Sequence, residues 1–168
     1  MRIRPANTAG DAEAIAAIYA PFVTDTVVSF EDVPPTADEM ATRIERLTST
    51  HPWLVAEDAG EIAGYAYATP YRSRPAYRHT VENSIYVRVD RLGTGLGKLL
   101  LPALIAATQI CGMHQMVAVI GDSANLASIR LHRRFGFRDA GLLKDVGFKF
   151  DRWLDTVFMQ RSLLQDDL

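Results

Sequence analysis

The sequence predicts a mixed α/β fold, because strand-like and helix-like patterns alternate along its 168 residues. Residues 80–89 are rich in β-branched residues and tyrosine, which is typical of a strand. A glycine-rich turn leads from them into an apolar segment, 96–110, that is long enough for a helix, and a short apolar strand follows at 116–120. Residues 80–120 therefore form the clearest strand–helix–strand unit of the chain.

The residues before this unit predict two helices and a hairpin. Helical spacing of apolar residues begins at Asp11, and Thr36 with Glu39 has the form of a capping box that opens a second helix. The expected segments are a short strand at 3–5, a helix from Asp11, a helix through Leu47, and hairpin strands at 53–57 and 62–69 around the turn at 58–60.

The residues after the unit predict one helix and two strands. The helix begins at Asn125 and ends near Gly136, since glycine favours the left-handed conformation that often closes a helix. Strands are expected at 138–144 and 154–163. No linker or change of composition divides the chain, so we expect a single domain over residues 1–168.

Composition and charge argue against several classes of protein. The net charge is −2, and 48% hydrophobic with 23% charged residues is ordinary for a globular protein. The basic stripe of a nucleic-acid-binding protein is missing. No apolar run approaches the ~20 residues of a membrane-spanning helix. The first residues lack the apolar stretch of a secretory signal, so a cytoplasmic protein with no membrane partner is expected.

Cysteine and histidine give no sign of a metal centre. The one cysteine, Cys111, rules out an internal disulfide and is expected to be a buried thiol at a helix end. His79 and His114 have no partners at the spacing of metal ligands, so we expect no metal.

Three glycines at alternate positions, Gly93, Gly95 and Gly97, lie where the strand at 80–89 passes into the helix at 96–110. Glycine allows the backbone to approach a ligand closely, and the unpaired amides at a helix N-terminus favour a negative charge. Together these features predict a cradle for a diphosphate. The alternative is a flexible turn without a ligand.

Two common nucleotide-binding motifs do not fit this turn. A dinucleotide-binding fingerprint needs a third glycine where Lys98 stands. A P-loop needs Ser or Thr where Leu99 stands and glycine where Leu92 stands. The remaining nucleotide candidate is the pyrophosphate loop of a CoA-dependent acetyltransferase.

The turn and the segments around it resemble the GNAT superfamily of N-acetyltransferases, in particular the branch of phosphinothricin and methionine sulfoximine or sulfone acetyltransferases. The segments that carry the resemblance are 80–87, 94–100, 116–120, 125–137, 146–155 and 158–160. The resemblance implies the GNAT fold, with a mostly antiparallel central sheet of about six to seven strands and helices on both faces. It also implies acetyl-CoA as co-substrate, a homodimer, and a role in resistance or detoxification.

One position in the turn departs from the superfamily. Gln or Arg usually stands three residues before Gly95, but this chain has Leu92 there and Arg91 one place earlier. We therefore expect contacts from the backbone of the turn rather than from a side chain at position 92.

The resemblance implies cofactor contacts from three segments. A backbone amide near Val87 would donate to the thioester carbonyl, and Val87 and Val89 would pair with the pantetheine amides. Asn125, Ser128 and His132 share one helix face, which the resemblance places along the pantetheine arm and the sulfur. The full set of expected contacts is Tyr86, Val87, Val89, Gly93, Thr94, Gly95, Leu96, Gly97, Lys98, Asn125, Ser128 and His132.

The polar residues of that helix face have plainer alternatives. His132 could protonate the leaving thiolate or relay a proton, or it could be a surface histidine without a role. Asn125 could act only as the helix cap.

Glu82 is the candidate general base. An amine with a pKa near ~10 is mostly protonated at neutral pH, so a carboxylate beside it can accept the proton and attract the ammonium. Strand alternation puts Glu82, Ser84 and Tyr86 on one face and Asn83 on the other, unless a bulge shifts the register. The alternative is that Glu82 only pairs with a nearby arginine.

Three arginines in a polar loop precede Glu82. Guanidinium groups can hold the carboxylate of a zwitterion while Glu82 receives its amine, which fits a free amino acid better than a protein lysine. An aromatic wall could complete the pocket. The expected substrate-binding residues are Phe30, Arg72, Arg74, Tyr77, Arg78 and Glu82. For the arginines, a solvated loop or a subunit contact remains the alternative.

The leading hypothesis is acetylation of the amino group of a small, amino-acid-like molecule by acetyl-CoA. A protein or peptide N-terminal acetyltransferase of the same fold should lack the arginine clamp. A non-catalytic CoA-binding module could lose Glu82 and His132, and this chain retains both. The sequence leaves open which amine is the substrate.

Overall fold

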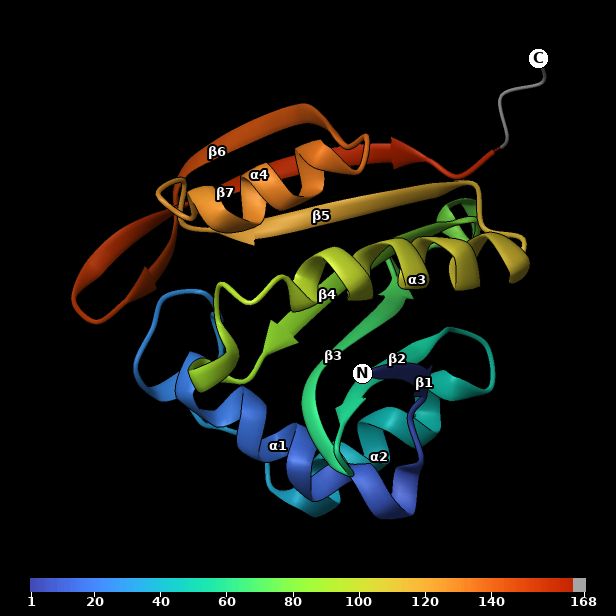
Figure 1. Ribbon diagram of the computed structural model, residues 1–168. Helices are drawn as coiled ribbons and strands as arrows, with labels where there is room; N and C mark the ends of the chain where they lie inside the picture. The colour runs from blue at the N-terminus through green and yellow to red at the C-terminus, as the bar shows by residue number, and fades with distance from the viewer. Residues whose placement is uncertain (165–168) are drawn as a thin grey trace.

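The computed structural model describes residues 1–164, in which seven strands form one sheet in the order β1-β2-β3-β4-β5-β7-β6 (Figure 1). Every neighbouring pair is antiparallel except β4 and β5, which are parallel. The expected mostly antiparallel sheet is confirmed. The strands are β1 (Arg2–Pro5), β2 (Trp53–Asp58), β3 (Glu61–Pro70), β4 (Thr80–Val87), β5 (Gln115–Gly121), β6 (Arg138–Lys149) and β7 (Arg152–Ser162).

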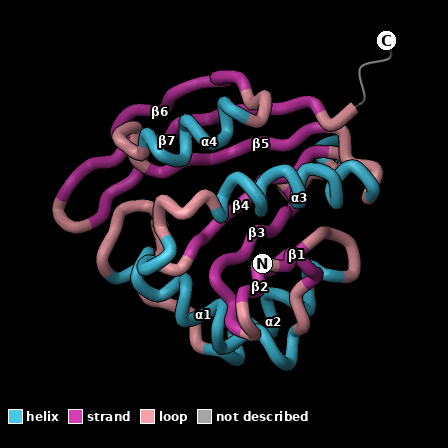
Figure 2. The backbone as a smooth tube through the Cα atoms, viewed as in Figure 1, coloured by secondary structure: helices cyan, strands magenta, loops and turns pink. Residues whose placement is uncertain are grey.

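Helices cover both faces of the sheet, as expected (Figure 2). On one face, α1 and α2 enclose a core that includes Ile15, Trp53 and Tyr65. On the other, α3 and α4 enclose a core that includes Leu104 and Phe137. The helices are α1 (Thr8–Thr24), α2 (Ala37–Thr48), α3 (Leu96–Ile110) and α4 (Leu126–Arg134). Within residues 1–164, none of the helices is both long and apolar enough to cross a bilayer.

The capping signals in the sequence are confirmed. The Thr36 hydroxyl accepts from the amide of Glu39 at 3.2 Å, and the Glu39 carboxylate accepts from the amide of Thr36 at 2.8 Å. The first helix begins three residues before Asp11, because Asn7 caps it and accepts from the amide of Ala9 at 3.1 Å. Asp11 in turn accepts from the amide of Asn7 at 2.7 Å, so it braces the cap from inside the first turn.

Three sequence expectations were wrong in detail. The fourth strand ends at Val87 rather than Val89, because the chain turns there into a 3₁₀ helix, Val89–Arg91. The last two strands meet in a longer hairpin than expected, since residues up to Lys149 pair with residues from Arg152 onward. Cys111 is exposed, because it follows the last turn of α3 at the surface.

Gly64 allows β3 to lie close to β4. A Cβ at this position would lie 2.9 Å from the carbonyl oxygen of Tyr86 and 3.3 Å from the Cα of Val87. These backbone atoms are held by the hydrogen bonds of the sheet and cannot move away to make room for a side chain.

We expect Gly64→Ala to lower the free energy of unfolding by about 1–3 kcal/mol in urea denaturation. The control is Gly141→Ala on β6, where an added Cβ meets nothing within 4 Å. Equal effects of the two changes would contradict this account.

Candidate active site

The parallel strands β4 and β5 separate toward their carboxyl ends. They pair from Thr80 with Gln115 as far as Asn83 with Ala118, and no further. Beyond that point, residues 84–87 keep their partners on β3, and 119–121 keep theirs on β7. Both arrowheads point to the same side of the molecule in Figure 1. A slot therefore opens through the sheet between residues 84–87 and 119–121. Along this slot, the edges of β4 and β5 that face each other have backbone NH and CO groups that are not hydrogen-bonded to the opposite strand.

The glycine turn lies at the N-terminus of α3, beside this slot. Gly93 and Gly95 have φ angles of 76° and 92°, and a Cβ added at either would meet no atom within 4 Å. Gly95 is the N-cap of α3 and, having no side chain, makes no side-chain hydrogen bond to its first turn. Among residues 1–164, the amides of Leu96 and Gly97 have no hydrogen-bond partner, as is usual for a first helical turn. The turn thus presents free amides to open space.

Gly97 has a different task from the other two glycines. A Cβ on Gly97 would lie 2.9 Å from a methyl carbon of Leu131, so its small size lets α4 pack against the start of α3. The alternating pattern in the sequence therefore combines two requirements, a turn with positive φ and close helix packing.

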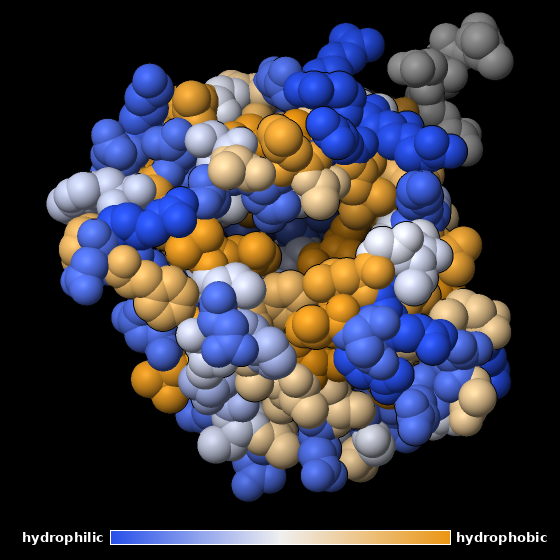
Figure 3. All heavy atoms as spheres, turned by 60° about the vertical axis from the view of Figure 1, so that its left-hand side comes forward, coloured by the Kyte–Doolittle hydropathy of each residue, from blue (hydrophilic) through white to orange (hydrophobic). Residues whose placement is uncertain are grey.

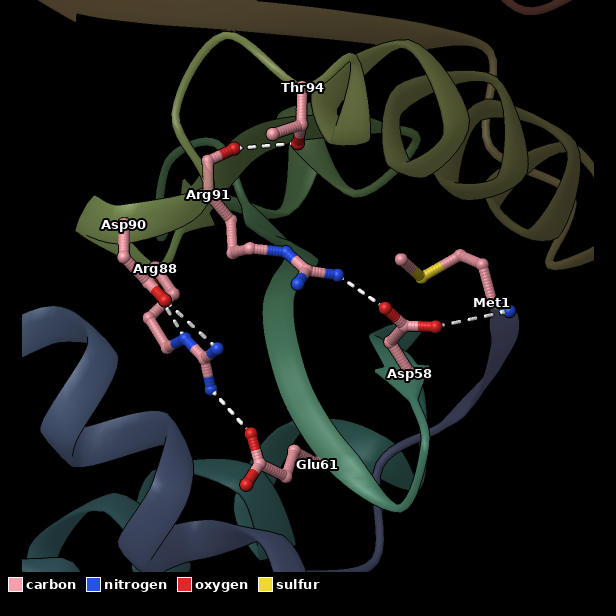
Figure 4. A network of polar contacts seen from close by, with 7 residues as sticks. All are labelled: Met1, Asp58, Glu61, Arg88, Asp90, Arg91 and Thr94. Atoms are coloured by element: carbon pink, nitrogen blue, oxygen red, sulfur yellow. Dashed lines mark hydrogen bonds and ion pairs between the residues drawn. The ribbon is translucent and has the colours of Figure 1, made fainter.

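Ion pairs hold the loop that leads into the turn (Figure 4). The Arg88 guanidinium donates to Glu61 at 3.0 Å and to Asp90 at 2.7 Å, and Arg91 pairs with Asp58 at the end of β2. The Thr94 hydroxyl donates to the carbonyl of Arg91 at 2.7 Å. These arginines are occupied by carboxylates of the chain itself, so they fix the loop in place.

Two cavities adjoin along the turn and the slot. One, of about 490 Å³, is lined by the turn and by Lys98, Arg130 and Arg134. The other, of about 410 Å³, follows β4 and β5 beyond their last pair. Leu92 and Leu131 line both. Figure 3, which brings the left-hand side of Figure 1 forward, shows a hollow bordered by apolar residues. A cationic, amide-rich end thus leads into an apolar channel.

His132 lies in the wall of this channel and is 4% exposed. Its Nδ1 lies 2.8 Å from the carbonyl oxygen of Ser128, which can only accept, so Nδ1 carries a hydrogen. Its Nε2 then accepts from the side-chain amide of Asn83 at 2.9 Å. Burial lowers the pKa of His132, which favours this neutral state.

Asn83 is the residue of this wall that sequence reasoning missed. It is 5% exposed, and its Oδ1 has no hydrogen-bond partner among residues 1–164. Strand alternation put Asn83 on the face opposite Glu82 but gave it no role. Its contact with His132 spans 49 positions, so no local pattern could show it.

Asn125 and Ser128 lie at the start of α4. The Asn125 side chain accepts from the amide of Ser128 at 3.2 Å, which confirms Asn125 as the cap of α4. Both residues line the channel. Val89 does not, and the strand-like pairing expected of it has no strand to support it. The Tyr86 ring packs against Tyr19 on the α1 face, at 4.8 Å between centroids.

Glu82 lies on the opposite face of the sheet from His132, near the closed end of the slot. The β3–β4 register is unbroken from Val81 to Val87, so no bulge alters the alternation. Glu82 pairs with Val117 one position before the strands separate. Burial raises the pKa of its carboxyl, and the charge of Arg72 offsets this only in part. The carboxylate is therefore more basic than usual.

The arginine loop lies at the surface beside Glu82. Arg72 is exposed and lies 5.0 Å from the centre of the Tyr71 ring. Arg78 donates to the carbonyl of Pro75 at 3.2 Å, and Arg74 is also exposed. Of the three, only Arg72 acts electrostatically on Glu82.

The two aromatic residues expected in the substrate pocket lie apart. Tyr77 packs edge-on against Tyr71 and lines a separate cavity of about 450 Å³ that β6 and β7 complete. Phe30 lies against Gly121, the last residue of β5, where the slot is open.

Comparisons with known proteins identify the family of this fold and site. The Acetyltransferase (GNAT) domain family matches residues 3–158. The chain belongs to the GNAT family of acetyltransferases. GNAT acetyltransferases use acetyl-CoA, so the protein is an acyltransferase with acetyl-CoA as its co-substrate.

Individual GNAT relatives are similar over nearly the whole chain. A phosphinothricin N-acetyltransferase of Alcaligenes faecalis is 51% identical over 94% of this chain and 80% of its own. An L-methionine sulfoximine/L-methionine sulfone acetyltransferase of Pseudomonas aeruginosa is 46% identical over 96% of this chain and 94% of its own. An acetyltransferase of Salmonella typhimurium, solved with acetyl-CoA, superposes with a TM-score of 0.94 at 40% identity, covering 99% and 96% of the two chains.

The residues of this chain fit acetyl-CoA. The open space above Gly93 and Gly95, the free amides of α3 and the cation Lys98 suit a pyrophosphate. The apolar channel suits a pantetheine arm. The unpaired backbone groups of β4 and β5 along the slot could form hydrogen bonds with the amides of that arm. Among residues 1–164, no group of three or more His, Cys, Asp and Glu side chains could hold a metal ion.

Proposed function

We propose that this GNAT enzyme acetylates the amino group of a small, amino-acid-like substrate of the phosphinothricin, methionine sulfoximine or methionine sulfone type, with Glu82 as general base. The observation that carries the proposal is the position of Glu82 at the closed end of the slot. The glycine turn lies on the α3 side of the sheet, the channel continues through the slot, and this carboxylate lies on the α1 side. The names of the relatives support the substrate class.

The slot allows the two reactants to meet from opposite faces. Acetyl-CoA supplies a thioester that an amine can attack. A thioester lodged between β4 and β5 would lie within about two residues of Glu82, which is roughly 7 Å along a strand. An amine arriving from the α1 face would then be held between the thioester and the carboxylate, in line for attack.

Glu82 removes a proton from the substrate ammonium, directly or through one water. Its raised pKa brings its basicity nearer to that of the amine. The unpaired amides on the inner edge of β4, near Val87, supply the donor for the carbonyl as negative charge develops on it.

His132 lines the channel and does not act as the acid in this proposal. Its Nε2 accepts from Asn83 and carries no proton to give to a thiolate. In this proposal, His132 and Asn83 together shape the wall of the channel near the thioester sulfur.

Arginine at positions 72, 74 and 78 binds the substrate carboxylate in this proposal. Phe30 borders the slot at its open end, and Tyr77, which lines a separate cavity, is given no role in the pocket. The loop is exposed, and Arg72 is already close enough to influence Glu82. A fork of guanidinium donors matches a carboxylate, which a peptide N-terminus does not carry beside its amine. The proposal places the reaction in the cytoplasm.

A panel of acceptors tests the substrate class. Release of CoA thiol should be fast with methionine sulfone, methionine sulfoximine or phosphinothricin, and slow with methionine sulfone methyl ester, because the ester cannot pair with the arginines. We expect the ester to lose roughly 10–100-fold in kcat/KM, the range for a charge-assisted contact of about 1.5–3 kcal/mol. Equal rates for acid and ester, or preference for peptides, would favour the N-terminal acetyltransferase.

Glu82→Gln tests the base. We expect kcat to fall by ~10²–10⁴-fold while CoA binding is kept. In the wild type, activity should decline as acid protonates Glu82, at a pH above the ordinary carboxyl value because its pKa is raised. That acidic limb should vanish in the variant. Because the pKa of Glu82 is higher in the folded than in the unfolded state, ionisation of this carboxyl at neutral pH lowers the free energy of unfolding. The uncharged Glu82→Gln variant should therefore be at least as stable as the wild type. A loss of CoA affinity equal to the loss of kcat would show a structural role instead.

We also propose that the protein is a homodimer. The hairpin of β6 and β7 exposes six large apolar side chains, more than a solitary surface hairpin usually carries. These are Leu142, Leu143, Val146, Phe148, Phe150 and Trp153. Light scattering should give twice the mass of the chain, and Trp153→Glu should shift it toward the monomer. A wild-type protein that is monomeric at micromolar concentration would contradict the proposal.

A further inference from the structure

Lys149 is a buried lysine that the proposed chemistry does not use. It is 6% exposed, at the end of β6. Its ammonium donates to the carbonyl oxygens of Val23 and Ser29, both at 2.7 Å, and of Glu31 at 2.8 Å. An ammonium has three hydrogens, and here each has a backbone acceptor. Such complete pairing is what makes a buried charge tolerable.

The three acceptors lie 118 to 126 positions away, at the end of α1 and just after it. Val23 is in the last turn of α1, where the carbonyls lack helical partners and the helix dipole favours a cation. That last turn has no basic residue of its own. Lys149 therefore supplies, from the far end of the chain, the charge that closes α1.

Residues 24–31, which we call the wall segment, border the open end of the slot. Thr26 and Val28 line the channel. The Phe30 ring lies directly on two glycines, since a Cβ on Gly121 would lie 2.7 Å from it and a Cβ on Gly147 would lie closer still. The ring thus bridges the end of β5 and the strand that carries Lys149.

The other side of the wall segment is held by α1 and α2. The Tyr19 hydroxyl lies 2.6 Å from that of Ser29 and donates to the Glu31 carboxylate at 2.9 Å. Arg43 on α2 donates to the same carboxylate at 2.8 Å. These contacts fix one edge of the segment, and Lys149 is the contact that ties it to β6 beside Phe30.

We propose that Lys149 is a positioning residue that clasps the wall segment and thereby sets the place of Phe30 at the acceptor side of the slot. The inference rests on the proposed function only in assigning that side to the amine substrate. Without the clasp, the three backbone carbonyls lose the donor that Lys149 provides, and the segment moves away from β6. The acceptor pocket then loses its wall while the glycine turn keeps its shape.

Lys149→Met and Lys144→Met provide the matched test, because Lys144 is an exposed lysine on the same strand. In Lys149→Met we expect faster amide hydrogen exchange in residues 24–31 and unchanged exchange in α3. We expect kcat/KM for the amine to fall roughly 10–100-fold, mainly through its KM. The dissociation constant of CoA should rise much less, because the wall segment lines only part of the channel and none of the cavity at the glycine turn. Lys149→Arg should recover part of the loss, and Lys144→Met should match the wild type.

Gly147→Ala probes the same wall if loss of the lysine prevents folding. Its Cβ would push against the flexible, half-exposed Phe30 ring rather than against backbone, so the fold should survive. We expect the amine KM to rise and CoA affinity to stay. Unchanged exchange in residues 24–31 of Lys149→Met, or equal losses of amine and CoA affinity in both variants, would overturn the inference. If the wild type acetylates no amine, the proposed function fails, and the exchange measurement still decides the clasp.

Discussion

The separation of β4 from β5 after Asn83 and Ala118 is the feature on which the rest of the site depends. A sheet that stays closed isolates its two faces, because its ladder bonds leave no passage between strands. Here each strand keeps a partner on its outer side and gives up the one on its inner side. The protein therefore retains a continuous sheet for stability and gains an opening in which groups from both faces meet.

Ion pairs fix the loop beside the glycine turn without any ligand. Arg88 and Arg91 are engaged with carboxylates near the ends of β2 and β3, and they anchor the loop ahead of the helix. Lys98 and two arginines of α4 line the cavity beside Arg91. Basic residues near the turn thus have two roles. Those paired with a carboxylate of the chain hold the loop in place, and the others make the cavity positively charged.

Local signals in the sequence predicted most of the fold. Three of these signals involve residues only a few positions apart, so the sequence alone shows them. They are the capping box at Thr36, the cap at Asn125 and the glycine turn. The contacts of Asn83 and Lys149 join residues 49 to 126 positions apart. Such pairings arise only when the sheet brings distant segments together, and a lysine in a strand otherwise looks like an ordinary surface residue.

The exposure of Cys111 has a practical consequence for solution studies. It is the one cysteine of the chain, and it follows a helix of 15 residues whose other end is the glycine turn. At 1.5 Å per residue, a fluorophore or spin label attached there would lie about 22 Å from the glycine turn. That distance suits energy transfer or dipolar spectroscopy, and no cysteine would have to be removed or introduced first.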